Sequence, residues 1–109
     1  KVNFLGDISA FPEDLQSLIE KLSCASIRET KGTLNVAMNY GSRSEIVRAV
    51  NKAVEKGEKV TEQTFSELLY TAGMPDPDFV IRTSGEMRLS NFLLYQIAYS
   101  ELYFCKKYW

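Results

Sequence analysis

The fold is decided by the stretch TLNVAMNY, residues 33–40. Its interior is mostly apolar and does not alternate cleanly, which is typical of a strand covered on both faces in a parallel sheet. A Gly41-Ser42 break follows, and a helix is expected from about Ser44 to Lys56, where Gly57 is a good stop signal. This strand-to-helix unit indicates an α/β architecture. The apolar stripe expected to be buried on the helix consists of Ile46, Val47, Val50 and Val54, with Ala49 and Ala53 beside it.

Further strands and helices are expected on both sides of this unit. Strands are predicted at residues 2–6, 79–83 and 102–104. One helix is predicted to open at Pro12 and to fade between Cys24 and Thr30, and its inward stripe is Leu15, Leu18, Ile19 and Leu22. Another is capped by Thr61 or Thr64, with Thr64 and Glu67 the stronger capping box, and it ends at Gly73. Residues 92–99 are expected to be helical or a buried turn-rich segment. The order β-α-β-α-α-β-α-β predicts a mainly parallel sheet with helices on both faces.

Composition excludes several classes of protein. The 109 residues carry a formal net charge of −1, which argues against a general nucleic-acid binder, and the length suggests one domain. No apolar run approaches the roughly 20 residues that a membrane span requires. The absence of histidine excludes Ser-His-Asp and Cys-His catalysis and histidine metal sites. Any metal must therefore be held by oxygen, which favours Mg²⁺ or Ca²⁺. Two cysteines without a C-x-x-C motif fit reduced thiols and a cytoplasmic location.

A polar loop after the strand at residues 79–83 has the strongest chemical character. Arg82 lies at the carboxyl end of that strand, where ligands bind in open α/β sheets, and Arg88 and Ser90 follow on the loop. Two guanidinium groups and a hydroxyl suit a diphosphate, which offers many acceptors and a high charge. Alternatively, these arginines pair with Glu86 and Asp78 on a solvated loop, and spacing alone does not decide between the two interpretations.

Two other features are weaker. Glu101 stands between tyrosine-containing apolar patches, so it either contributes to an Mg²⁺ site or serves as a cap or salt-bridge partner, and the pattern favours the structural role. The turn from Asn39 to Glu45 offers backbone N–H groups that an anion could approach. It lacks the glycine spacing of a P-loop, which favours a capped helix start with Arg43 on the surface.

Taken together, these segments resemble one family. The stretch DFVIRTSGEMRLSNFLLYQIAYSELYF at residues 78–104 resembles the cis-prenyltransferases of the undecaprenyl diphosphate synthase type. The stretch LNVAMNYGSR at residues 34–43 is similar to a second signature of that family, with Ser42 where a second glycine is usual, and FLGD at residues 4–7 is similar to the preceding strand. The resemblance implies that residues 1–109 are the C-terminal part of a larger α/β domain. The upstream half, with its D-G-N-x-R-x-A motif and Mg²⁺-binding aspartate, is expected to be absent from this chain.

The resemblance also implies a function. Such an enzyme condenses isopentenyl diphosphate with an allylic diphosphate such as farnesyl diphosphate, using Mg²⁺, to make a long-chain polyprenyl diphosphate for an undecaprenyl diphosphate-like lipid carrier. The chain holds no catalytic residue on this view and is expected to be inactive alone. The implied substrate-binding residues are Arg82, Met87, Arg88, Leu89 and Ser90, although Met87 stands where a polar residue is frequent; Glu101 would bind the metal, Glu86 would support the arginines, and Asn39, Arg43 and Glu45 would have structural roles.

A homodimer is also implied by the resemblance, together with peripheral membrane association for release of a lipid product. Two alternatives stay open. One is a non-catalytic subunit of a heteromeric cis-prenyltransferase, against which the retained arginine, serine and glutamate pattern argues. The other is a generic phosphate-binding α/β module, which would show no preference for isoprenoid diphosphates.

Overall fold

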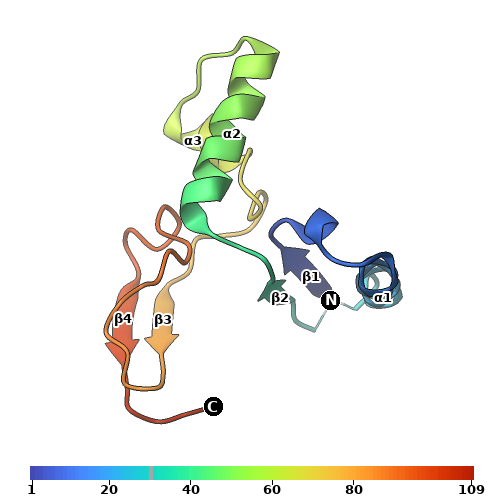
Figure 1. Cartoon of the computed structure of the whole chain (residues 1–109). Helices are drawn as coiled ribbons and strands as arrows, with labels where there is room; N and C mark the ends of the chain where they lie inside the picture. The colour runs from blue at the N-terminus through green and yellow to red at the C-terminus, as the bar shows by residue number, and fades with distance from the viewer. Residues whose placement is uncertain (30) are drawn as a thin grey trace. The chain divides into compact units, whose positions relative to one another are not determined.

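The computed structural model describes residues 1–29 and 31–109 of the chain, and Thr30 lies outside the described residues. The chain divides into two compact units, Lys1–Tyr40 and Gly41–Trp109. Figure 1 labels the helices and strands of each unit. Each unit contains one pair of parallel strands, and the two pairs are separate two-stranded sheets. The predicted α/β class and the parallel pairing are confirmed, but within the described residues sheet hydrogen bonds join β1 only to β2 and β3 only to β4.

The first unit is a strand-helix-strand arrangement. Its elements are β1 (Val2–Leu5), a short 3-10 helix η1 (Ile8–Ala10), α1 (Glu13–Ala25) and β2 (Leu34–Ala37). The strands pair in register from Val2 opposite Leu34 to Leu5 opposite Ala37. Acidic residues in the first turn of α1 suit the positive end of the helix dipole, as the sequence predicted. The helix ends at Ala25, and the part of the expected fading that falls on Thr30 lies outside the described residues.

Of the stripe predicted for α1, Ile19 alone is fully buried, whereas Leu18 and Leu22 are exposed. Within this unit α1 packs mainly against β1, so the two-stranded sheet covers only part of the predicted stripe.

The second unit contains α2 (Ser42–Lys56), α3 (Glu62–Ser66), β3 (Phe79–Arg82) and β4 (Glu101–Phe104). The strands β3 and β4 pair in register from Phe79 opposite Glu101 to Arg82 opposite Phe104 (Figure 1). Gly57 ends α2 in the left-handed conformation, with φ of 65°, as the sequence predicted. Residues 92–99 form turns rather than a regular helix, which agrees with the turn-rich alternative.

Of the two caps predicted for α3 the structure has Thr61, and both the favoured Thr64–Glu67 capping box and the predicted length of the helix are wrong. The capping box joins Thr61 and Thr64, because each threonine hydroxyl accepts a hydrogen bond from the other residue's backbone N–H, at 3.2 and 2.8 Å. Thr64 is therefore the third helical residue and not the cap. Hydrogen-bonded turns replace the helix after Ser66, although the sequence predicted that it would continue to Gly73.

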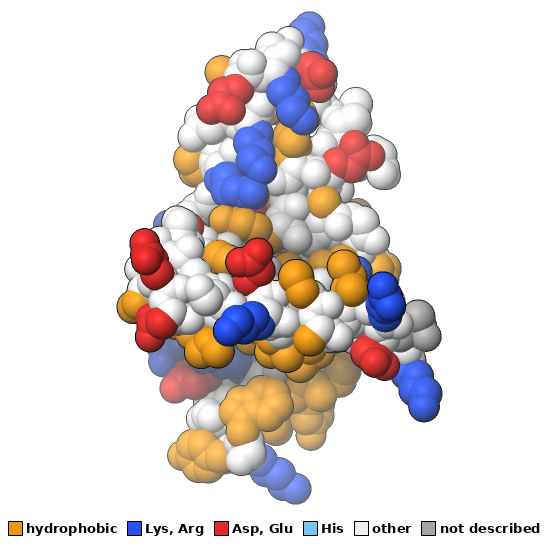
Figure 2. All heavy atoms as spheres, turned by 90° about the vertical axis from the view of Figure 1, so that its right-hand side faces the viewer, with side chains coloured by type: hydrophobic (Ala, Val, Ile, Leu, Met, Phe, Trp, Pro, Cys, Tyr) orange, Lys and Arg blue, Asp and Glu red, His pale blue; other side chains and the backbone are white. Residues whose placement is uncertain are grey.

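The buried face of α2 also differs from the prediction. Its buried residues are Ser42, Glu45, Ala49 and Ala53. The three valines of the predicted stripe, Val47, Val50 and Val54, are exposed instead, Val54 to 72%, whereas Ile46 is half-buried. In Figure 2, hydrophobic side chains lie at the surface among the charged ones. Within residues 1–29 and 31–109, no helix combines the length and apolarity needed to cross a membrane.

We expect Gly6→Ala to reduce the free energy of unfolding by about 3 kcal/mol or more, because only glycine tolerates this backbone position. Gly6 has φ of +125°, and a Cβ there would lie 2.1 Å from the backbone oxygen of Met38. Gly32→Ala is the matched control, since a Cβ at Gly32 meets nothing within 4 Å. Urea denaturation of the purified protein measures both changes, and equal stabilities of the two variants would contradict the prediction.

Candidate functional site

Arg82 ends β3 and lies beside a cavity. Its backbone carbonyl accepts a hydrogen bond from the Cys105 N–H at 2.9 Å, which holds the strand end against β4. The cavity has a volume of about 290 Å³ and is lined by Ile81, Arg82, Thr83, Ser84, Phe92 and Trp109. Among the described residues, no hydrogen bond or ion pair engages the guanidinium of Arg82, which is half-buried. A permanent positive charge is therefore available at the strand end, next to two hydroxyl groups and apolar walls.

Arg88 forms a surface ion pair with Glu86. Its Nη2 donates to Oε2 of Glu86 at 2.5 Å, and the Arg88 side chain is 70% exposed. The pairing with Glu86 that the sequence left open is therefore present. An exposed ion pair contributes only about 0–1 kcal/mol, so a ligand of higher charge can replace Glu86 at small cost. Ser90 is exposed nearby in sequence, as is Met87, whereas Leu89 is half-buried.

The start of the loop is tied to the chain beyond β4. The N–H of Ser84 donates to the carbonyl of Lys107 at 2.8 Å, and the N–H of Gly85 donates to the carbonyl of Cys105 at 2.9 Å. Both Ser84 and Gly85 have positive φ, at 67° and 72°. The hydrogen bonds extend the parallel pairing beyond the strands and determine the direction in which the loop leaves Arg82.

The end of the loop is bound to the start of α2. The N–H of Ser42 donates to the carbonyl of Asn91 at 2.8 Å, and the N–H of Arg43 donates to Oδ1 of Asn91 at 2.9 Å. Asn91 thus binds two of the backbone donors that the sequence offered to an anion, those of Ser42 and Arg43. The side chain of Arg43 itself is exposed, as expected for a surface position.

A buried carboxylate lies in the same unit. Glu45 is 1% exposed; its Oε2 accepts from the N–H of Tyr70 at 2.7 Å, and its Oε1 accepts from Nε2 of Gln96 at 3.0 Å. The same Gln96 nitrogen lies 3.2 Å from the hydroxyl of Thr71. The sequence indicated a structural role for Glu45 but not its burial. The available signal was that Ala49 and Ala53 share its helix face, since small residues allow close packing.

Asn39 belongs to the first unit. Its side-chain Nδ2 donates to the carbonyl of Asp7 at 2.8 Å, and its own carbonyl accepts from the N–H of Asp7 at 3.3 Å. These bonds join the chain after β2 to the chain after β1. Asn39 has φ of 46°, a left-handed conformation that asparagine tolerates better than most residues.

Glu101 lies at the other end of the strand pair from Arg82. It begins β4 opposite Phe79, and Arg82 ends β3 opposite Phe104. Three residues along a strand correspond to about 10 Å. The exposed carboxylate of Glu101 is an oxygen donor of the kind that Mg²⁺ prefers, but no group of three potential ligands among Asp, Glu, Cys and His occurs in the described part of the chain. Glu101 is therefore at most one ligand of an incomplete site.

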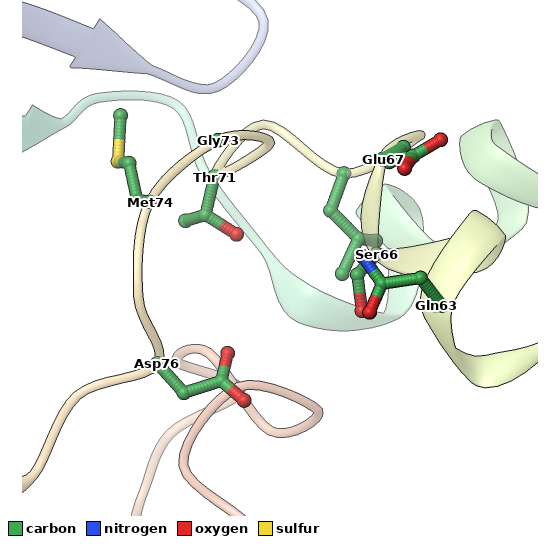
Figure 3. Close-up of a pocket in the computed structure, with 8 residues that line it drawn as sticks. Gln63, Ser66, Glu67, Thr71, Gly73, Met74 and Asp76 are labelled. Carbon is green, nitrogen blue, oxygen red and sulfur yellow. The ribbon is translucent and has the colours of Figure 1, made fainter.

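A smaller cavity of about 150 Å³ lies between α3 and the turns that follow it. Figure 3 shows Gln63 and Ser66 together on one side, with Asp76 on the loop after Gly73. The carboxylates of Asp76 and Glu67 do not point toward one another (Figure 3). A pair of carboxylates that shares a substrate or a metal is therefore not formed in this cavity.

The comparisons of this chain with known proteins all match one family. The prenyltransferase family model described as undecaprenyl diphosphate synthase matches residues 1–109. An isoprenyl transferase of Fusobacterium nucleatum is 60% identical over 99 residues, which are 90% of this chain and 43% of that protein. An isoprenyl transferase of Thermotoga maritima is 48% identical over 114 aligned positions, covering all of this chain and 49% of that protein. The chain thus spans about half the length of these relatives.

Solved structures show the same similarity. The crystal structure of a probable undecaprenyl diphosphate synthase from Campylobacter jejuni matches with a TM-score of 0.88 and 30% identity, over 98% of this chain and 50% of that one. Lavandulyl diphosphate synthase from Lavandula x intermedia, in complex with dimethylallyl diphosphate, matches with a TM-score of 0.91 and 37% identity, over 98% of this chain and 49% of that one.

We expect Glu45→Ala to lower the free energy of unfolding by about 2–4 kcal/mol, because it leaves the Tyr70 N–H and the Gln96 amide buried without this acceptor. Glu55→Ala on the exposed side of the same helix is the control, with an expected change within about 0.5 kcal/mol. Thermal and urea unfolding of both variants check this. A similar small loss for both would show that the buried carboxylate does not stabilise the fold.

Proposed function

Because the chain belongs to the undecaprenyl diphosphate synthase family of prenyltransferases, we propose that its protein condenses isopentenyl diphosphate with an allylic diphosphate such as farnesyl diphosphate. The proposed product is a long-chain polyprenyl diphosphate, the precursor of an undecaprenyl diphosphate-like lipid carrier. Names of relatives support diphosphate substrates: one from Thermococcus kodakarensis is a tritrans,polycis-undecaprenyl-diphosphate synthase specific for geranylgeranyl diphosphate. The lavandulyl synthase structure contains dimethylallyl diphosphate, which is also allylic.

The observation that carries the proposal is the charge at the carboxyl end of β3. Arg82 has no hydrogen-bond or ion-pair partner within the described residues, and it borders a cavity that also exposes Thr83 and Ser84. Arg88 follows on the loop with only a weak surface partner. Guanidinium groups bind phosphate oxygens with two parallel hydrogen bonds, and two of them offset most of the charge of a diphosphate.

In this proposal the chain binds and orients isopentenyl diphosphate. Arg82 and Arg88 hold the diphosphate, the hydroxyl of Ser90 donates a further hydrogen bond, and Glu86 keeps Arg88 extended before the substrate arrives. Met87 and Leu89 contribute apolar surface beside the isoprenoid part of the substrate. When the substrate is fixed in this way, less translational and rotational entropy remains to be lost on reaching the transition state. The groups that act on the reacting carbons are proposed to lie in the rest of the protein.

The proposed cofactor is Mg²⁺, which helps an allylic diphosphate to leave by stabilising negative charge on its oxygens. Glu101 would contribute one carboxylate oxygen, and the remaining ligands would be substrate phosphates and groups beyond these 109 residues. The position of Glu101 at the amino end of β4 leaves it free of the arginines at the opposite end of the strand pair.

We further propose that residues 1–109 are the C-terminal part of one prenyltransferase domain in a homodimeric cytoplasmic protein, which associates peripherally with a membrane to release its product. The apolar side chains exposed on α1 and α2 support the proposal that the chain is part of a larger domain, because the rest of that domain would cover them. The coverage of only about half of each relative supports it as well.

In the full-length protein, we expect Arg88→Ala to weaken isopentenyl diphosphate binding by about 10–100-fold, the loss of a charge-assisted pair, with a much smaller effect on the allylic diphosphate. Isothermal titration with each substrate separately measures both affinities. Arg28→Ala, an exposed arginine in the first unit, is the control. Equal losses for the two substrates would overturn the assignment of Arg88.

The isolated 109-residue chain is expected to show no turnover, because it holds no catalytic residue in this proposal and no group of three metal ligands among its described residues. Incorporation of radiolabelled isopentenyl diphosphate into a butanol-soluble product tests this, with the full-length protein as the positive control. Sustained incorporation by the chain alone would refute the expectation.

A further inference from the structure

The start of α2 is capped by a residue that is distant in sequence. The first N–H groups of a helix have no partner within the helix, and they usually bind a side chain, water or an anion. Gly41 precedes α2 and offers no side-chain cap. The N–H groups of Ser42 and Arg43 donate instead to the carbonyl and Oδ1 of Asn91, which is 48 positions from Arg43. Asn91 thus supplies both of the acceptors on its own.

Close approach of the two segments depends on the residues around this contact. A Cβ at Gly41 would lie 2.8 Å from Nδ2 of Asn91, so the missing side chain makes room for the asparagine amide. Ser42 is fully buried, and its hydroxyl oxygen accepts a hydrogen bond from the N–H of Leu94 at 3.1 Å. The chain is therefore held at Asn91 and again at Leu94.

At and beside Asn91 the backbone adopts conformations that residues with a side chain disfavour. Ser90, Asn91 and Leu93 have φ of 49°, 63° and 45°. This left-handed region is destabilising for residues other than glycine. It is least so for asparagine, because its short side chain forms local hydrogen bonds. Such a conformation persists only where surrounding contacts impose it. The bonds to Ser42 and Arg43 are those contacts, and Ser90 adjoins them directly.

We propose that Asn91 is a positioning residue, which by occupying the amino end of α2 fixes Ser90 and Arg88 in the geometry that binds a diphosphate. The proposal rests on the function proposed above. In it, the helix end orients the loop instead of binding the substrate phosphates, and the arginines provide the charge. The cost of the left-handed backbone is met before the substrate binds, so binding does not have to order the loop.

The test uses the full-length protein, with isopentenyl diphosphate titrated calorimetrically and its KM and kcat measured. Asn91→Ala is expected to raise Kd and KM about tenfold and to change kcat less than twofold at saturation. Asn91→Asp retains an acceptor for the Arg43 N–H and is expected to restore affinity to within about threefold. Asn51→Ala, at an exposed position on α2, is the matched control and is expected to behave as wild type.

Gly41→Ala provides a second probe that deletes no polar group and serves if Asn91→Ala does not fold. Its Cβ displaces the Asn91 amide, so it should raise Kd in the wild-type background and add no further loss in Asn91→Ala. Additive losses, or wild-type affinity in both Asn91→Ala and Gly41→Ala, would overturn the positioning role. Arg88→Ala separates the two proposals: if it too leaves affinity unchanged, the diphosphate site fails, whereas a loss there with none at Asn91 rejects the positioning role alone.

Discussion

The second unit depends on one buried carboxylate. A charged group removed from water loses several kilocalories per mole of hydration, and it is retained only where donors replace the water. For Glu45 these donors include the backbone of Tyr70 and the side chain of Gln96. They come from segments 25 and 51 residues away along the chain. The carboxylate also lies in the first turn of α2, where the helix dipole favours negative charge.

This constraint determines which face of α2 is inside. Packing Glu45 against the turns at 69–71 and 93–97 brings Ala49 and Ala53 inward and turns the valines to the surface. The same rotation points the amino end of α2 at Asn91. Burial of a structural carboxylate and support of the polar loop are therefore coupled through one helix, because Glu45 and the residues that Asn91 binds lie in the same first turn of α2.

Sequence reasoning succeeded where the signal was local. Apolar runs bounded by turn residues located all four strands, and Gly57 located the end of α2. The rotation of α2 was missed because periodicity treats valine as more buried than alanine and places glutamate in solvent. The inward position of Glu45 depends on partners far along the chain. Of the two caps predicted for α3, the favoured one, Thr64 with Glu67, is wrong and Thr61 is correct, because two threonines at that spacing cap each other as well as a threonine and a glutamate do.

In the candidate site, too, local sequence predicted some features, and contacts between distant segments determine the others. Residue type and position after a strand were sufficient to single out Arg82, Arg88 and Ser90, but no local pattern shows that Glu101 lies at the other end of the strand pair, since that follows from register. Nor does any pattern show that Asn91 binds α2. The result is a loop whose backbone is fixed by hydrogen bonds to a helix and to the chain after β4, while its arginines keep only a weak partner or none within the described residues. A backbone fixed by hydrogen bonds and carrying weakly paired charges suits reversible binding of an anion, because little ordering cost opposes binding and no strong ion pair among the described residues competes with it.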